Sequence, residues 1–243
     1  MALNKYGWFL DGHPGSGLVA GGPVVAESRL LYFELTITHA YVSGFDPASV
    51  GFGIADGTAS LSDTGFWNNA AEQADMAGVF GMHGNTQGST AGVNYPNPRY
   101  GAPAGSVSNN VYACAVNFVT DLIWFKNITA AGTWVGSTTG GDPAAGTLGW
   151  SIAGLFTGPV YAFGGTTQRN DTNYGAGTLN LGGSAFVGTP PTGYVAWGAA
   201  DTLNPSDKYS GITLSGGNLT FSTSGAGDLA SQGRIVRTIG AHS

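Results

Sequence analysis

The chain has 243 residues, of which 42 are glycine, 14 acidic and 8 basic, and 42% are hydrophobic. This is too much core-forming material for a disordered protein. The net charge of −6 and the scattered lysines and arginines offer no surface that would neutralise phosphates, so we expect no nucleic-acid binding. The chain has only three glutamates, which is too few for long charged helix faces and argues against an all-helical protein.

Short alternating or apolar runs, separated by Gly, Pro, Asn and Asp, recur along the chain and predict β-strands joined by turns. In the first run, Leu31 to Thr38, apolar and polar residues alternate as a half-buried antiparallel strand requires. Further strands are predicted over 50–55, 111–119, 122–126, 159–164, 178–181 and 193–197. One helical turn is expected over 70–77. Many short strands with frequent turns predict an all-β fold, a two-sheet antiparallel β-sandwich.

The cysteine count and the lengths of the apolar runs limit the classes of protein to which the chain can belong. Cys114 is the one cysteine, so no intramolecular disulfide can form and the length of the chain must supply stability. No apolar run approaches the about 18 residues that span a bilayer, so we expect no membrane insertion. Residues 1–10 lack the apolar core of a signal peptide, and we expect a soluble chain made in the cytoplasm.

Four segments occur in an order that resembles a SPRY domain, and they cover roughly residues 30 to 197. They are Tyr32-Phe33-Glu34, Val50-Gly51-Phe52-Gly53, the run from Ala113 to Trp134, and Phe186 with Pro191, Gly193, Tyr194 and Trp197. In that family the central signature is a strand, a tight turn near an acidic residue, and an aromatic strand ending in Lys-Asn and followed by Trp. The residues at those places are Asp121, Trp124, Phe125, Lys126, Asn127 and Trp134. The resemblance implies a bent, concanavalin-like sandwich of two sheets.

Two further stretches, Gly141 to Thr147 and Asn204 to Leu214, resemble the SPRY modules of bacteriophage virion proteins. This resemblance implies a virion component, in the tail, a fibre or the head, that is made in the host cytoplasm. Its expected partners are other virion proteins, further copies of the same chain in a homo-oligomer, and a glycan or protein of the host surface.

The order of the segments departs from that of the phage modules. There, a segment like 204–243 precedes the strand that Leu31 to Thr38 represents, whereas here it comes last. Three interpretations follow: a circular permutation whose last strands complete the chain's own sandwich, strands donated to a neighbouring subunit, or the stub of a second module. We therefore divide the chain into a sandwich over 1–205, with a long loop insertion over 60–110, and a C-terminal β-hairpin extension over 206–243 that completes the same or a neighbouring sandwich.

Candidate catalytic groups are sparse, and the common phosphate, dinucleotide, zinc-protease and hydrolase motifs are absent from the sequence. Glu34 is the first suspect for a glycosidase carboxylate, but no second acid lies two residues away, and a solvated or cross-strand-paired side chain is the simpler interpretation. Asp121 falls at a predicted turn, where aspartate commonly bonds the backbone. Asp142 and the run 171–173 offer too few oxygens for Ca²⁺. Cys114 and the four histidines show no ligand spacing, so we expect no enzyme, no metal and no cofactor.

The insertion over 60–110 is the strongest candidate for a binding site, because connections this long are usually functional or disordered. The residues that we expect to bind a ligand there are Trp67, Asn68, Asn69, Tyr95, Arg99 and Tyr100. Aromatic faces stack on sugar rings or bury area against proteins, while amides adapt their hydrogen bonds. A satellite core beneath the loop would use the same aromatic residues. Three functions therefore stay open: recognition of host glycan or protein, a purely structural assembly module, and a glycan-cleaving enzyme.

Overall fold

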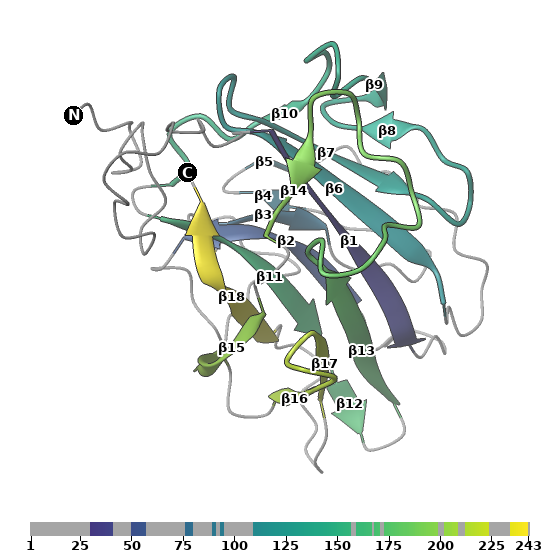
Figure 1. Cartoon of the computed structure of the whole chain (residues 1–243), viewed down its shortest axis with the longest axis vertical. Coiled ribbons are helices and arrows are strands. Elements are labelled where there is room, and N and C mark those ends of the chain that lie inside the picture. The colour runs from purple at the N-terminus through teal and green to yellow at the C-terminus, as the bar shows by residue number, and fades with distance from the viewer. Residues whose placement is uncertain are drawn as a thin grey trace, which may run out of the picture.

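Two β-sheets pack face to face in a sandwich (Figure 1). The computed structural model describes residues 30–40, 50–56, 76–79, 89–90, 93–94, 109–156, 159–166, 168–170, 173–198, 202–208, 212–223 and 234–242. Within these ranges all regular structure is β, and no helix there is long and apolar enough to cross a membrane. Of the helical turn predicted over 70–77, Met76 and Ala77 lie in a strand and the rest falls outside the described residues. The predicted all-β, two-sheet antiparallel fold is confirmed.

The larger sheet has β1 (Leu30–Ala40) near its centre. Its strands in spatial order are β16 (Ile212–Ser215), β17 (Thr220–Thr223), β13 (Asn173–Asn180), β1, β6 (Val111–Asn117), β7 (Leu122–Asn127), β8 (Trp134–Val135) and β9 (Thr139–Gly141). Three short strands join it at the side: β10 (Trp150–Ser151) on β7, β12 (Gln168–Asn170) on β13, and β14 (Val195–Ala196) parallel to β1.

The smaller sheet is antiparallel throughout its described pairings. Its strands in spatial order are β15 (Leu203–Lys208), β18 (Arg234–His242), β11 (Val160–Thr166), β2 (Val50–Asp56), β3 (Met76–Val79), β4 (Ser89–Thr90) and β5 (Val93–Asn94).

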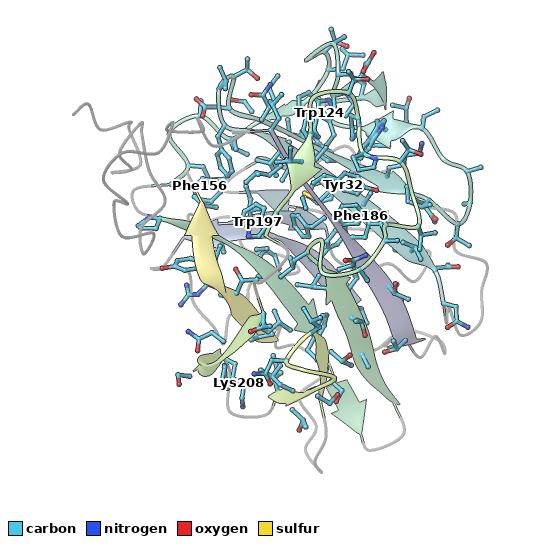
Figure 2. The ribbon with its side chains drawn as sticks, viewed as in Figure 1. Tyr32, Trp124, Phe156, Phe186, Trp197 and Lys208 are labelled. Atoms are coloured by element: carbon cyan, nitrogen blue, oxygen red, sulfur yellow. The ribbon has the colours of Figure 1, made fainter. Side chains whose placement is uncertain are left out.

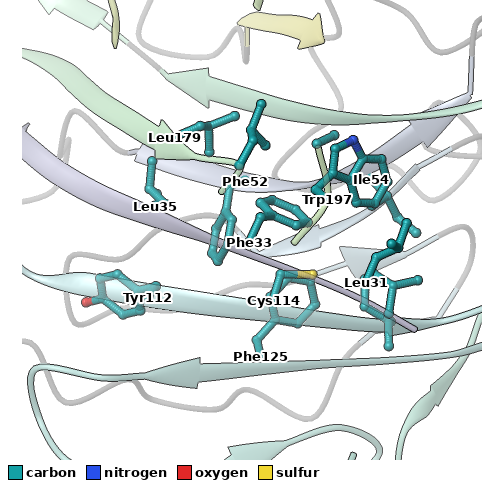
Figure 3. Close-up of a cluster of buried hydrophobic side chains, with 14 of the residues drawn as sticks. Leu31, Phe33, Leu35, Phe52, Ile54, Tyr112, Cys114, Phe125, Leu179 and Trp197 are labelled. Atoms are coloured by element: carbon teal, nitrogen blue, oxygen red, sulfur yellow. The ribbon is translucent and has the colours of Figure 1, made fainter. Parts of the chain in front are cut away.

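The core between the sheets is built from alternate residues of the central strands (Figure 3). Phe33, Leu35 and Ile37 of β1 are fully buried there, as the alternation of the sequence predicts. The Phe33 ring meets the ring of Phe52, from the opposite sheet, edge to face at a centroid distance of 5.6 Å. It also meets Trp197 at 5.3 Å, so the segment that follows β13 reaches into the same core. Aromatic pairs of this geometry add to the free energy gained by burial.

The last third of the chain contributes strands to both sheets. β17 pairs with β13 in the larger sheet, while β18 pairs with β11 in the smaller one, so these strands dock within their own chain. The Phe221 ring of β17 lies between the sheets where Gly164 of β11 and Gly177 of β13 leave room for it. A Cβ at Gly164 would lie 2.3 Å from the ring, and one at Gly177 would lie 2.9 Å from it. The ring therefore fills space that two glycines, one in each sheet, leave open.

Candidate functional site

The outer face of the larger sheet, away from the smaller sheet, carries a second hydrophobic cluster. Its buried members are Tyr32, Ala113, Ala115, Trp124 and Tyr194, and its half-buried members are Leu30, Leu122, Ile128, Trp134 and Phe186. Residues 128–149 and 181–198, which include the short strands β8, β9 and β14, contribute Ile128, Trp134, Phe186 and Tyr194 to this cluster, and together we call them the outer loop layer (Figure 2). Because of this layer, β6 is buried on both faces rather than alternating between core and solvent.

Glu34 fastens the outer loop layer to the sheet. Its side chain is 1% exposed, and it accepts hydrogen bonds from the Tyr32 hydroxyl at 2.6 Å, from Val187 N at 2.9 Å and from Gly188 N at 2.8 Å. Burial, with the Glu34 carboxylate beside it, raises the pKa of Tyr32 well above its usual range, which keeps the hydroxyl a donor. The expectation of a solvated or cross-strand-paired Glu34 is therefore wrong, because its partners are the Tyr32 hydroxyl on the same strand and two backbone amides of a distant segment.

Gly188 allows this close approach. A Cβ at this position would lie 2.7 Å from Cδ1 of Ile128 and 2.9 Å from the Tyr32 hydroxyl oxygen, so any larger residue would displace the loop from the carboxylate.

Trp124 and Tyr194 fix the rest of the outer loop layer. Trp124 Nε1 donates to the carbonyl oxygen of Thr147 at 2.9 Å, and the Tyr194 hydroxyl donates to that of Pro143 at 3.2 Å. The second bond joins the two segments of the layer to each other. Burial raises the pKa of Tyr194 above its usual range, so this hydroxyl also stays protonated. Asp142 accepts bonds from Ala144 N and Ala145 N, and it therefore holds a turn.

Aromatic rings surround the Tyr32 side chain. The Phe186 and Trp134 rings meet Tyr32 edge to face at 4.8 Å and 6.4 Å, and the Lys126 ammonium lies 5.8 Å from the centre of the Trp134 ring. Trp134 and Phe186 are half-buried, whereas Trp124 and Tyr194 are buried. Most of the aromatic surface of the layer is therefore used for packing.

The exposed side of the outer loop layer carries three large apolar side chains among small and hydroxyl residues, and it is nearly free of charge. Val187 is 67% exposed, and Leu148 and Val195 are each 48% exposed. Asp142 is the one charged residue in the two segments. Leu148 has a φ of 56°, in the left-handed region that leucine rarely adopts. Sequence reasoning missed these residues, although two long stretches, 128–149 and 181–198, with a single charged residue between them are a signal that was available.

The other candidate catalytic or ligand groups take structural positions. Cys114 is fully buried, and burial raises the pKa of its thiol well above the usual value, as expected for a small hydrophobic residue of the core. Asp121 lies in the turn between β6 and β7 with a φ of 56°, and its carbonyl oxygen accepts a bond from Ile152 N. In the described ranges, His, Cys, Asp and Glu form no group of three or more that could hold a metal ion.

The residues expected to bind a ligand in the 60–110 insertion lie outside the described residues: Trp67, Asn68, Asn69, Tyr95, Arg99 and Tyr100. Their role as a binding site stays a prediction. Of the insertion, the structure describes β3, β4, β5 and residues 109–110.

Comparisons of the chain with protein-family models, with curated proteins and with solved structures find no match. The resemblance to SPRY domains and to phage modules therefore stays a prediction from the sequence.

Proposed function

We propose that the chain is a non-catalytic binding module of a bacteriophage virion and that the outer loop layer binds a protein partner. We choose this surface because Leu148, Val187 and Val195 are exposed on a layer that has a single charged residue. The centre of a protein interface is poor in charged residues and rich in apolar contact area. A surface held in place by buried hydrogen bonds also loses little conformational entropy on binding.

The aromatic side chains of the layer and of β7 beneath it favour a protein partner over a glycan. Sugar rings need exposed aromatic faces, but Trp124 and Tyr194 are buried and their polar atoms are engaged within the layer. Recognition of host glycan through Trp67, Tyr95 and the neighbouring residues of the 60–110 insertion is a separate prediction.

The buried positions of Glu34 and Cys114, the two side chains best suited to catalysis, support the non-catalytic part of the proposal. The Glu34 carboxylate accepts three hydrogen bonds in a buried position, and the Cys114 thiol lies in the core between the sheets. A general acid or a nucleophile must reach its substrate, and neither group reaches solvent.

The assignment to a virion rests on the resemblance of Gly141 to Thr147 and of Asn204 to Leu214 to phage modules. Its test is whether the chain is a stoichiometric part of density-gradient-purified particles made by the genome that encodes it. If the chain is found in the lysate but not in the particles, the virion assignment is wrong.

The binding surface is tested in the same particles with substituted chains. The double variant Val187→Asp with Val195→Asp places two charges on the layer, and we expect its incorporation to fall at least about tenfold with the melting temperature unchanged. Val119→Asp is the matched control, because Val119 is 65% exposed but lies in the turn between β6 and β7, outside the layer. Equal incorporation of both variants would show that the layer is not the binding surface.

A further inference from the structure

The edges of the two sheets meet at one side of the sandwich, where β15 and β16 lie next to each other (Figure 1). Among the described strands, β16 pairs with β17 alone and β15 pairs with β18 alone. An edge strand is where a further strand, including one from a second copy, can add to a sheet.

Lys208 occupies a backbone acceptor on the edge of the larger sheet. It is the last residue of β15, and its ammonium donates to the carbonyl oxygen of Ile212, the first residue of β16, at 2.6 Å (Figure 2). A hydrogen bond from a charged donor is stronger than one between neutral groups. Lys208 is half-buried, so an approaching strand would have to displace both the ammonium and the bond.

A second bond ties the same two edges together. Leu203 N, at the start of β15, donates to the carbonyl oxygen of Asn218 at 2.8 Å, in the turn between β16 and β17. β15 is therefore fixed to the β16–β17 hairpin at both of its ends, by Leu203 and by Lys208.

The edge of the smaller sheet is protected from strand addition in a different way. Pro205, in the middle of β15, has no N–H to offer, and Ser206 N donates to the Asn204 side chain at 2.9 Å. The register of β15 against β18 also shifts between Leu203 and Lys208. A strand with these interruptions is a poor template for a further strand.

We propose that Lys208 closes the β16 edge against strand addition by a second copy of the chain, so that each copy keeps its own C-terminal strands. This inference is independent of the proposed function, because it concerns the edge at β15 and β16 and not the outer loop layer.

The test is the solution mass of Lys208→Met over a range of protein concentrations, measured by light scattering and compared with the unsubstituted protein. Methionine keeps the length and much of the apolar stem of lysine but removes the donor and the charge. We expect association beyond the mass of the unsubstituted protein to appear at a concentration at least about tenfold lower, because a charge-assisted bond no longer competes with the incoming strand.

Two variants serve as controls. Lys126→Met removes the other strand lysine whose side chain is described, which lies over Trp134 rather than on an edge carbonyl, and it should keep the unsubstituted mass. Lys208→Arg keeps a charged donor at the edge and should also keep that mass. Circular dichroism and thermal melting show whether each variant is folded.

Each outcome of the light-scattering experiment either supports or overturns the proposal. A folded Lys208→Met that associates, with both controls unchanged, supports the proposal. A folded Lys208→Met with the mass of the unsubstituted protein at every concentration overturns it. Association of Lys126→Met to the same extent overturns it too, because the effect would then follow from any lost lysine. If Lys208→Met does not fold, Lys208→Ala is measured in its place, and unfolding of both variants assigns the lysine to stability and overturns the role in edge closure.

Discussion

The Tyr32 hydroxyl donates a 2.6 Å hydrogen bond to the Glu34 carboxylate two residues further along β1. Residues two apart on a strand lie on the same face, so both side chains point away from the core between the sheets. Tyr32 packs against Phe186 while Glu34 accepts the amides of Val187 and Gly188, and three consecutive residues of the outer loop layer are held by one pair of side chains.

Replacing the carboxylate should loosen this attachment. In Glu34→Gln one acceptor oxygen becomes an NH₂ group that faces a donor, and we expect the free energy of unfolding to fall by about 1–3 kcal/mol. Urea unfolding measures the loss, and hydrogen exchange should quicken at the amides of Val187 and Gly188. Asp142→Asn is the matched control, because Asp142 also accepts two backbone amides but is exposed, and its effect should be smaller. An equal effect in both variants would contradict the role of burial.

Stability should fall at alkaline pH. Burial raises the pKa values of Tyr32, Tyr194 and Cys114 in the folded protein, while the unfolded chain releases these protons near the ordinary values of 10.0 for tyrosine and 9.0 for cysteine. Above these values the unfolded state binds fewer protons than the folded state, so the free energy of unfolding decreases as pH rises. The contribution of these groups is fully present below about pH 8.

Urea unfolding across the range from about pH 8 to about pH 11 measures this slope. Tyr194→Phe removes one of the titrating groups along with its bond to Pro143, and its slope should be shallower. A free energy of unfolding that is constant over the range would show that these groups titrate equally in both states.

Removal of the Phe221 ring should leave a cavity between the sheets. Phe221→Ala is expected to lower the free energy of unfolding by about 3–5 kcal/mol, because Gly164 and Gly177 have no side chains to fill the space. Leu214→Ala on the neighbouring β16 should cost less, since Leu214 is only partly buried. If the two losses were equal, Phe221 would not fill a central position between the sheets.

Deletion of residues 207–243 should abolish the fold. It removes β16, β17 and β18, which leaves β13 and β11 without a neighbour on one side and removes Phe221 from the core. Circular dichroism and limited proteolysis should report an unfolded chain. A truncated chain that melts cooperatively at the original temperature would show that these strands are dispensable.

The central strands could be predicted from the sequence because their signal is local. The alternation over 31–38 gives β1 and its inward-facing residues Phe33, Leu35 and Ile37, and the apolar runs give β2, β6 and β7. Strands of two or three residues, such as β8, β9 and β10, are too short to show any period. The parallel pairing of β14 with β1 has no local signal either.

The candidate site could not be predicted in the same way, because its contacts join residues far apart in the chain. Glu34 bonds the amides of residues 187 and 188, which carry no side-chain signal of that contact. Tyr32 beside Glu34 on one strand face was the available hint, since a tyrosine hydroxyl that is buried needs an acceptor. The burial of Ala113 and Ala115 likewise depends on a layer of loops that no strand pattern reveals.

The position of Phe221 has a consequence for the chain as it emerges from the ribosome. β1 can pair with β6 on one side but needs β13 on the other, and β11 needs β18 beside it, so neither sheet is complete until its late strands have been made. Translation at about 5–20 residues per second leaves the early strands unpaired for seconds, a period long compared with the collapse of a small chain. A nascent chain with its early strands exposed is a substrate for chaperones. The sandwich can close only when the last strands have left the ribosome and brought Phe221 into its place.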